Sequence, residues 1–424
     1  MKTRLFLMAM ASVALASCVS EDVSDVKQKD EKVKIAFETP VLYNNSESRA
    51  EVPGEIGHHE YDGIIYSYPR EEKFQIYAVQ YNNTATFTSW NADGVEKAEF
   101  NDKPVEWAGI GIDGWAPKDA SNNYYYWPTN KKMAFAACSP ADLDLDEYNE
   151  TTKPEGVKRE YSSTGLNITN FSIPVKNDGA YYDLLFSERT IDKTAADMSH
   201  NASYYSGIPI KFQHALASVR FSLMNKTLAT VKLTKIELWG VNSKANFTEG
   251  ITTENTEYKR ATYNSTNNQY NDDGNVKPQW SGHDNSIAES APYIGFVGDI
   301  DFPHPNANYV STISSYENEK NTEDNECHQL LLLPQVLPDN ATLRVHYIVG
   351  SQSHYKDVLL KNQLAYQDPN NTETSTSKSI DEWEIGKRYT YRLVYSDATQ
   401  QQDMIYFAPS TDEWKDEDII VVNL

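Results

Sequence analysis

The chain has 424 residues and a formal net charge of −23 at pH 7. Such an acidic composition argues against a nucleic-acid-binding protein and against adsorption to anionic lipid. Aromatic residues make up 12%, most of them among the 28 tyrosines. With no sustained helical periodicity and no repeat of fixed period, this composition is typical of a β-protein, and the length suffices for two domains.

Residues 1–17 have the composition of a secretory signal peptide. A basic start at Lys2 and Arg4 precedes an apolar run over residues 5–15, which is too short to remain in a bilayer as a spanning helix. The run ends in Leu-Ala-Ser-Cys, the lipobox pattern, in which the thiol of Cys18 receives a diacylglyceryl group before cleavage. We expect an exported protein held to a membrane by acyl chains on Cys18. A plain cleaved signal peptide with an incidental cysteine is the alternative.

The segment after the signal peptide changes character twice. Residues 18–31 are polar and acidic and are predicted to form a disordered tether. Val33, Ile35 and Phe37 then alternate with charged or small residues, which predicts a first β-strand. Residues 44–52 are polar again and predict an accessible loop.

Short apolar runs separated by turn-rich loops continue to the end of the chain. They predict strands over residues 74–79, 133–138, 183–187, 208–223, 231–239, 329–335, 343–349, 383–393, 405–409 and 419–424. Many short strands of this kind imply an all-β fold of antiparallel β-sandwiches. We place a boundary near residue 205, which gives an N-terminal domain over residues 32–205 and a C-terminal domain over residues 206–424.

The run over residues 208–223 contains a change of parity. Its apolar residues occupy even positions up to Leu216 and odd positions from Val219 onward. A strand cannot move its apolar face to the other side without an extra residue. A bulge or a tight break is therefore predicted near Ala217 and Ser218.

Two motifs that can carry chemistry are incomplete. Residues 109–114 match G-x-G-x-x-G, but the Trp-Ala-Pro that follows, ending at Pro117, cannot open the helix that a nucleotide site needs. Asp142, Asp144 and Asp146 begin like a calcium loop, yet its glycine and its bidentate acid are missing. A turn-rich loop and a solvated acidic loop are the predictions, with weak calcium binding outside the cell as an alternative for the second.

The remaining reactive residues favour structural roles. His58-His59-Glu60 lacks a helix and a fourth metal ligand, and His214 lies on the apolar side of its strand, as a hydrogen-bonded core histidine does. Cys138 and Cys327 lie in different halves of the chain, so two buried thiols are favoured over a disulfide. Since no nucleophile, triad or paired carboxylates stand in a recognisable frame, we predict no enzyme, no cofactor and no metal site.

Several segments taken in order resemble the fimbrillin family, the type V pilins of Gram-negative anaerobes. The resemblance covers most of the chain after Cys18, and its specificity lies in the order of motifs that are individually degenerate. The segments that carry it are the lipobox at residues 15–18, the early strand at 33–37 followed by Arg49, Tyr126-Trp127-Pro128 with residues 133–140, Asp183-Leu184-Leu185 with residues 208–221, Leu333-Pro334-Gln335, and Trp383 with residues 386–391.

This resemblance implies two transthyretin-like antiparallel β-sandwich domains in tandem and assembly into surface fimbriae by β-strand exchange. It implies a protease cut between Arg49 and Ala50, with Arg70 as a weaker alternative to Arg49. The cut would release the strand of Val33, Ile35 and Phe37. A C-terminal strand of another subunit would fill the groove, and its residues are Ile405, Phe407, Ile419 and Val421.

The resemblance also implies partners and a location. The partners are other fimbrial subunits, as a homopolymer and as accessory tip or anchor subunits, together with the outer membrane through the lipid on Cys18. The role as stalk, tip or anchor and the adhesion ligand stay open. So does the alternative that the C-terminal strand only completes its own domain. A surface glycan-binding lipoprotein that uses exposed tyrosine and tryptophan is the main rival, and a secreted hydrolase is the other.

Overall fold

The structure is a computed structural model, and every structural statement below concerns the part of the chain that it describes. The described residues are 33–38, 40–42, 59–61, 64–66, 68, 70–108, 114–141, 143, 156–173, 183–197, 207–250, 263–264, 269–270, 278–284, 291–302, 311–312, 326–327, 330–361, 363–364, 379–395, 412–413 and 420–423. Across these ranges the regular elements are β-strands, apart from one short 3-10 helix, η1 (Ala195–Asp197). The all-β prediction is therefore confirmed.

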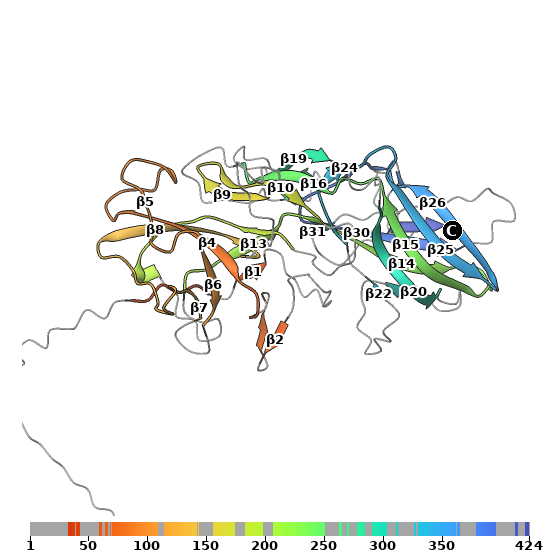
Figure 1. Cartoon of the computed structure of the whole chain (residues 1–424), viewed down its shortest axis with the longest axis horizontal. Helices are drawn as coiled ribbons and strands as arrows, with labels where there is room; N and C mark the ends of the chain where they lie inside the picture. The colour runs from red at the N-terminus through yellow and green to blue at the C-terminus, as the bar shows by residue number, and fades with distance from the viewer. Residues whose placement is uncertain are drawn as a thin grey trace, which may run out of the picture.

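One end of the elongated molecule contains a nine-stranded sheet and a four-stranded sheet (Figure 1). The larger sheet runs in the order β1 (Val41–Leu42), β13 (Lys211–His214), β11 (Leu185–Ser187), β8 (Lys131–Ser139), β4 (Phe74–Asn82), β6 (Lys103–Trp107), β7 (Trp115–Pro117), with β12 (Thr190–Lys193) on β8 and β5 (Glu96–Lys97) on β4. The smaller sheet runs in the order β19 (Gln279–Asp284), β16 (Lys244–Thr248), β10 (Gly165–Ser172), β9 (Lys158–Ser162).

The other end contains a six-stranded and a five-stranded sheet (Figure 1). The six-stranded sheet has the order β21 (Ser311–Thr312), β14 (Ala217–Asn225), β30 (Lys387–Tyr395), β31 (Asp412–Glu413), with β23 (Leu330–Leu332) on β14 and β32 (Ile420–Asn423) on β30. The five-stranded sheet has the order β22 (Glu326–Cys327), β20 (Tyr293–Asp301), β15 (Val231–Trp239), β25 (Thr342–Val349), β26 (Gln352–Leu359).

Four two-stranded ribbons complete the described strands. They are β2 (His59–Tyr61) with β3 (Ile64–Tyr66), β17 (Tyr263–Asn264) with β18 (Gln269–Tyr270), β24 (Gln335–Val336) with β29 (Glu382–Trp383), and β27 (Gln363–Leu364) with β28 (Ser379–Ile380).

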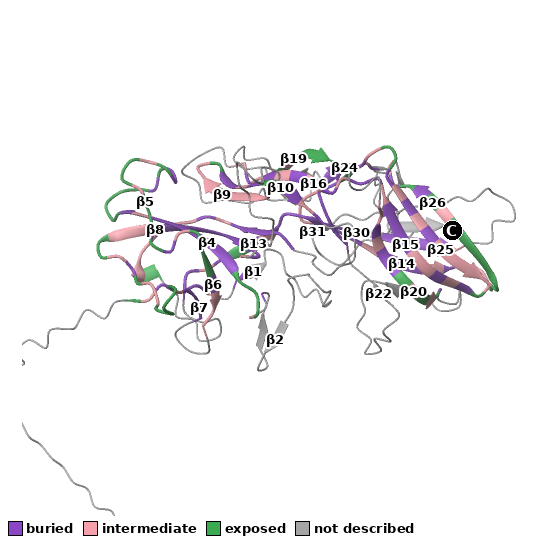
Figure 2. Cartoon of the chain, viewed as in Figure 1, coloured by how far each residue is buried: buried purple, intermediate pink, exposed green. Residues whose placement is uncertain are grey.

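Strands β4 and β8 separate two apolar cores. Successive side chains of a strand point to opposite faces. One face of β4 sends Phe74 and Ile76 into a core shared with Phe135 of β8, and the other sends Tyr77 and Val79 into a larger core. Both strands are buried along most of their length, as the purple ribbons in Figure 2 show. Their near-continuous apolar sequence follows from burial on both faces.

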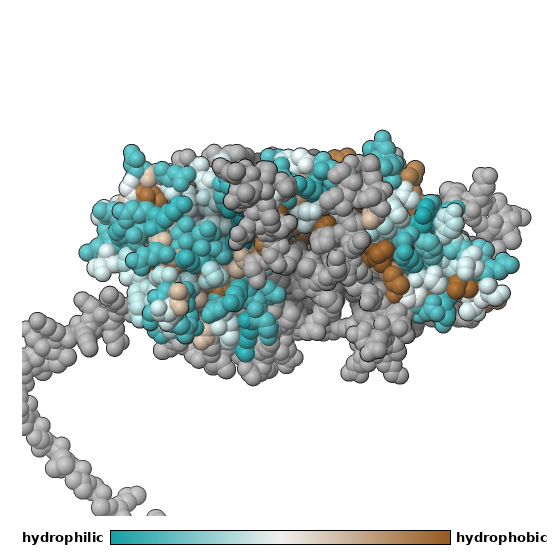
Figure 3. All heavy atoms as spheres, in the orientation of Figure 1, coloured by the Kyte–Doolittle hydropathy of each residue, from teal (hydrophilic) through white to brown (hydrophobic). Residues whose placement is uncertain are grey.

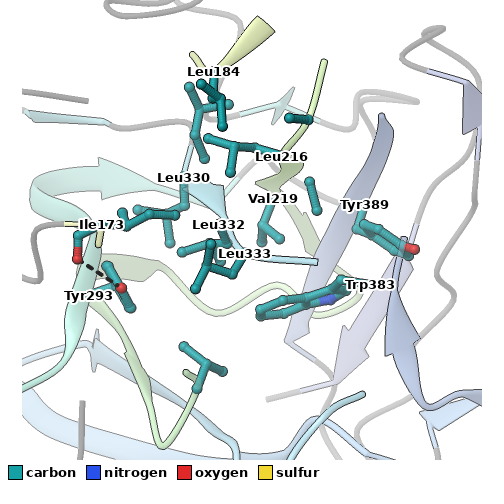
Figure 4. Packing of buried hydrophobic residues seen from close by; sticks show 14 of the residues in the cluster. Ile173, Leu184, Leu216, Val219, Tyr293, Leu330, Leu332, Leu333, Trp383 and Tyr389 are labelled. Carbon is teal, nitrogen blue, oxygen red and sulfur yellow. Dashed lines mark hydrogen bonds between the residues drawn. The ribbon is translucent and has the colours of Figure 1, made fainter. Parts of the chain in front are cut away.

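The larger core is continuous between the two ends of the molecule. Leu184 precedes β11 in the nine-stranded sheet, whereas Val219 lies on β14 of the six-stranded sheet, and both belong to this core (Figure 4). The hydroxyl of Tyr293 on β20 donates a hydrogen bond to the carbonyl of Ile173, which follows β10, at 3.2 Å (Figure 4). Apolar packing therefore joins the two halves.

The parity change near Ala217 and Ser218 has a clear structural cause. Strand β13 ends at His214 in the nine-stranded sheet, and β14 begins at Ala217 in the six-stranded sheet. The chain breaks for two residues and enters a different sheet, which confirms the predicted break. The predicted boundary near residue 205 stays a prediction, although strand pairing crosses that position, because β10 pairs with β16 and β11 with β13.

Candidate functional site

The first described residues, 33–38, lie in a gap at the margin of the nine-stranded sheet. We call residues 33–38 the N-terminal segment and the gap that they fill the seam. On one side of the seam stand Trp115 of β7 and residues 124–127, and on the other stands Ile208, just before β13. Strand β7 ends the path of the sheet, and the chain after the segment forms β1, which pairs in parallel with β13. The N-terminal segment therefore joins the two ends of the sheet.

Backbone hydrogen bonds hold the segment on both sides. Toward β7, the Ile35 N–H donates to the carbonyl of Tyr125 at 2.9 Å, and the Phe37 N–H donates to that of Trp115 at 2.8 Å. In return the Trp115 N–H donates to the Phe37 carbonyl at 3.3 Å. The Trp127 N–H donates to the Val33 carbonyl at 2.9 Å.

Toward β13, the pairing is reciprocal. The Ile208 N–H donates to the Ala36 carbonyl at 2.9 Å, and the Glu38 N–H donates to the Ile208 carbonyl at 3.0 Å. If the segment left, backbone donors and acceptors would be unsatisfied on both walls at once. Unpaired strand edges of this kind are templates for pairing with another chain.

The side chains of the segment are unequal in burial. Ile35 and Phe37 are fully buried, whereas Val33 is 44% exposed. The Phe37 ring meets the rings of Phe74 and Phe135 edge to face, with centroids 6.0 and 5.4 Å apart. Burying one large apolar side chain of this type contributes about 1.5–3 kcal/mol. Most of the apolar contribution therefore comes from Ile35 and Phe37.

An aromatic cluster forms the floor of the seam around Phe37. Trp115 and Tyr68 have ring centroids 5.3 Å apart, and Phe74 lies 5.7 Å from Phe212. These rings belong to one buried core together with Phe135 of β8. Since the rings come from several strands, the cluster can persist when the N-terminal segment leaves. We expect the space left by Phe37 to become a groove lined by aromatic rings.

Gly207 is a residue of the site that sequence reasoning missed. A Cβ atom at this position would collide with the backbone of Phe37 and Glu38, so only glycine lets the two chains approach. The sequence signal was the single glycine just before the apolar run of residues 208–223. A glycine at the edge of a strand marks a close backbone approach.

The predicted processing and lipidation residues fall mostly outside the described residues, as Cys18, Arg49 and Ala50 do. The weaker alternative, Arg70, is described and is half-buried. Its guanidinium lies over the Trp107 ring at 4.7 Å from the centroid.

Of the predicted donor residues, only Val421 is among those described. It lies on β32, which pairs in parallel with β30 through Val421 opposite Arg392. Strand β31 pairs with the beginning of β30 at Arg388. Among the described residues, β32 therefore pairs with one strand of its sheet, β30. Ile405, Phe407 and Ile419 lie outside the described residues.

The histidine and cysteine predictions can be checked directly. The Nδ1 atom of His214 lies 3.0 Å from a carboxylate oxygen of Asp183, and both side chains are buried. This confirms a core histidine satisfied by a hydrogen bond. Cys138 is a free, buried thiol, and burial raises its pKa. A disulfide between Cys138 and Cys327 is therefore not formed.

The incomplete motifs remain loops or strands where they are described. Gly114 is followed directly by β7, with no helix at this place, as the sequence predicted. His59 and Glu60 lie on β2. Among the described residues, no group of three or more histidine, cysteine or acidic side chains stands close enough to hold a metal ion. Nor does any helix in these ranges have the length and apolarity to cross a membrane.

Two buried ionisable side chains lie at the N-terminal sheets, Glu249 just after β16 and Arg189 between β11 and β12. The Leu166 N–H donates to Oε2 of Glu249 at 2.8 Å. Nε of Arg189 donates to the Tyr161 hydroxyl at 2.8 Å, and another guanidinium nitrogen donates to the carbonyl of Ser163 at 3.0 Å. Burial raises the pKa of the fully buried Glu249 carboxyl to about 7, although the charge of Arg189 acts in the opposite direction.

Comparisons with known proteins give a family and several similar solved structures. A family model described as fimbrillin-like matches residues 67–411, which excludes the N-terminal segment and β32. A crystal structure of a fimbrial protein from Bacteroides vulgatus is 14% identical, with a TM-score of 0.39, over 76% of this chain and 87% of that chain. A candidate cell adhesion protein from Bacteroides uniformis is 12% identical, with a TM-score of 0.42, over 91% and 99%. No match is found among curated protein sequences.

Proposed function

The chain belongs to the fimbrillin-like family, and on this premise we propose that it is a structural subunit of cell-surface fimbriae. In this proposal the precursor is lipidated at Cys18 and reaches the outer membrane. A protease then cuts after Arg49, the N-terminal segment leaves, and subunits join by exchange of β-strands. The protein acts as a building element and not as an enzyme.

The observation that carries the proposal is the two-sided seam. A segment that closes a sheet between β7 and Ile208 is bonded on both sides and places Phe37 in an aromatic core. Its departure would create two adjacent unpaired edges and an apolar groove. A strand from another chain can satisfy both, because main-chain bonds supply affinity and alternating side chains supply specificity.

The partners in this proposal are further subunits of the same kind and accessory tip or anchor subunits. A subunit that keeps its lipid and its segment would remain at the membrane. One that loses the segment and offers a C-terminal strand would extend the fibre. This chain has predicted donor residues, Ile405, Phe407, Ile419 and Val421, with which it could extend the fibre. The proposal therefore favours a stalk subunit.

Limited trypsin digestion of the purified mature protein tests the proposal. We expect a preferred cut after Arg49, seen by intact mass, and then ladders that resist detergent on unboiled gels. An Arg49→Ala variant should lose both the cut and the ladders, and a variant lacking residues 405–424 should be cut yet stay a folded monomer. Ladders without any cut would contradict the proposal.

An exposed tyrosine on the other half of the molecule, beside an arginine and a half-buried tryptophan, favours a second candidate function, glycan binding at the cell surface. Tyr355 on β26 is 65% exposed, and the Arg344 guanidinium lies 5.3 Å from its ring and 5.8 Å from that of Trp239. Aromatic faces beside hydrogen-bonding groups suit sugars. Polysaccharide binding by the monomer that is lost in Tyr355→Ala would support this function, and equal binding by the variant would remove its basis.

The visible surface is consistent with a solvent-exposed subunit. In Figure 3 hydrophilic residues dominate the described surface, and apolar residues occur in small separate groups. Such isolated apolar residues are usual on soluble proteins and do not by themselves indicate an interface.

A further inference from the structure

We propose that strand β26 of one molecule pairs with β26 of a second copy of this chain, antiparallel about a two-fold axis, with Tyr355 opposite Tyr355 of the second copy. The two five-stranded sheets would then form one continuous sheet across the pair. This inference goes beyond the proposed function, because it needs neither proteolytic processing nor the seam. It concerns a surface on the other half of the molecule.

The surface is the outer edge of the five-stranded sheet. Strand β26 ends this sheet, and within the described part of the chain it pairs with β25 alone. It is eight residues long and exposed along most of its length (Figure 2). A long exposed edge of this kind is a template on which a further strand can pair.

The pairing with β25 fixes which backbone groups of β26 point outward. Directly after β26, the Leu360 N–H donates to the carbonyl of Ala341 at 2.9 Å. Hydrogen bonding alternates along an antiparallel pair, so the even-numbered residues of β26 bond to β25. The N–H and C=O groups of Ser353, Tyr355 and Asp357 therefore point away from β25, where a second strand can bond to them.

Charge selects the register of the pair. A two-fold antiparallel pair is centred on one residue, which lies opposite its own copy. Centring on Lys356 or Asp357 would place like charges directly opposite each other, which is unfavourable. Centring on Tyr355 avoids this and pairs residues 352–358. Centring one residue earlier would shorten the paired part of the strand to residues 352–356.

The same register matches the side chains that would meet. The Asp357 carboxylate would lie opposite the Ser353 hydroxyl of the second copy, and the two Tyr355 rings would pack together. Tyr355 is 65% exposed, and the Arg344 guanidinium lies 5.3 Å from its ring centroid. Arg344 also donates to both carboxylate oxygens of Asp357, at 2.6 and 2.8 Å. An aromatic ring on such a supported surface can pack with little loss of side-chain freedom.

The charge of this edge favours a second copy as its occupant. The whole chain carries a net charge of −23, which opposes the approach of two copies at most of their surfaces. The charged residues of β25 and β26 are Arg344, Lys356 and Asp357, so these two strands have a net charge of +1 with their histidines neutral. Two copies can therefore approach at this edge, because more distant charges are screened beyond about 8 Å at physiological salt.

The pair should be weak in dilute solution. It would use residues 352–358 of each chain, whereas stable interfaces use about 20–30 residues a side. We expect a Kd of about 10–1000 µM for this small contact. Copies that are held close together on one surface would pair more completely, because their effective concentration is higher.

Sedimentation of the purified, uncut mature protein over a series of concentrations tests the pairing. We expect a monomer–dimer equilibrium for the parent protein and for Ser353→Ala. Ser353→Pro should weaken the dimer by about 10-fold or more, because proline removes an outward N–H and its ring obstructs the second strand. The proline variant should stay folded, since this N–H does not bond to β25, and chemical denaturation checks this.

Pairwise cysteine cross-linking locates the register. In the proposed register His354 lies opposite Lys356 of the second copy, at the Cα separation of about 4.5 Å that a disulfide can span. A mixture of His354→Cys and Lys356→Cys proteins should therefore cross-link on oxidation. Neither variant alone should do so, because each position then lies about 8 Å from its own copy, beyond the limit of about 7 Å. The parent protein is the control for its native cysteines.

Each other outcome would overturn the proposal. A parent protein that stays monomeric up to about 1 mM would exclude the pair. A dimer that persists in Ser353→Pro, or that forms without cross-links in the mixture, would use another surface. Cross-links in one cysteine variant alone would place the axis at a different residue. Polysaccharide that protects Tyr355 on a protein that stays monomeric would assign the edge to a glycan. Since the protein is uncut, failure of strand exchange at the seam would not affect these results.

Discussion

The N-terminal segment and β32 lie near the two ends of the described chain, in different sheets that hold them differently. The segment lies between two walls, hydrogen-bonded to Trp115 on one side and to Ile208 on the other, with Phe37 fully buried. Within the part of the chain that the structure describes, strand β32 pairs with one neighbour, β30, over four residue pairs. The N-terminal segment closes a sheet, whereas β32 extends one.

This difference indicates what each strand can do in an assembly. A strand held on both sides leaves two edges and a groove when it departs, so its loss creates a binding site. Departure of a strand held on one side leaves a single edge of the kind that any open sheet already has. The N-terminal segment therefore suits the displaced role, whereas the departure of β32 would create no comparable groove.

The largest effect should follow from removing the Phe37 ring. Phe37→Ala in the uncut protein is expected to lower the free energy of unfolding by about 3–5 kcal/mol, because it leaves a cavity among Phe74 and Phe135. Chemical denaturation provides the measurement. Val33→Ala is the control, since Val33 is 44% exposed and its truncation should cost less than about 1 kcal/mol. Similar losses in both variants would mean that the segment is not anchored by its aromatic residue.

The next largest effect should come from pH, through the buried carboxyl of Glu249. Measuring the free energy of unfolding across a pH series tests whether this group stabilises the fold independently of the N-terminal segment. Burial raises the pKa of Glu249 from 4.5 to about 7, so the neutral carboxyl favours the folded state. This contribution is fully present below pH 4.5 and is lost as the pH rises through 7. The free energy of unfolding should therefore fall by about 3 kcal/mol between about pH 4.5 and pH 8, at about 1.4 kcal/mol per pKa unit.

The matched control for this series is Glu249→Gln, which keeps the size and removes the titration. Its stability should change little over the same pH range. Removal of the N-terminal segment should leave the pH dependence intact, because Glu249 contacts Leu166 and not the seam. An unchanged slope in the glutamine variant would assign the effect to other groups.

A smaller effect is expected from adding one methyl group to the wall of the seam. Gly207→Ala should destabilise the uncut protein by about 1–3 kcal/mol, because its Cβ would collide with the backbone of Phe37. The same substitution in the processed subunit should cost much less, since the segment is gone. Thermal unfolding of the two forms gives the comparison, and equal losses in both would place the strain elsewhere.

The last test needs no substitution. It compares amide hydrogen exchange in the N-terminal segment with that in β32. The N–H groups of Ile35 and Phe37 donate to Tyr125 and Trp115 from inside a closed sheet. Those of β32 belong to a strand that pairs, in the described ranges, with β30 alone. We expect exchange to be about 100-fold or more slower in the segment, because local opening is cheaper at an edge. Faster exchange at Phe37 than in β32 would reverse the comparison.

Part of the site could be read from the sequence. Alternation at Val33, Ile35 and Phe37 predicted a first β-strand. The structure places Ile35 and Phe37 in the core, but the segment forms isolated bridges at Lys34 and Phe37 and not a continuous strand. The exposure of Val33 was not foreseen, because alternation gives the face of a residue and not whether a neighbour covers it.

The identity of the walls could not be read in this way. Trp115 and Ile208 lie 78 and 171 positions after Phe37, and neither their sequence nor their spacing marks them as its partners. Backbone hydrogen-bonding groups are the same at nearly every residue, so a strand carries little local information about which edge it will meet. The lone glycine at position 207 was the available hint.

The sequence by itself determined the class of strand-rich fold, the break between β13 and β14, and the core position of His214, because each follows from the period of apolar residues along a short stretch. The tertiary structure alone decided that β10 pairs with β16 across the predicted boundary and that residues 33–38 close a sheet. Such pairings depend on which distant edges come together when the cores are buried, and no local pattern specifies them.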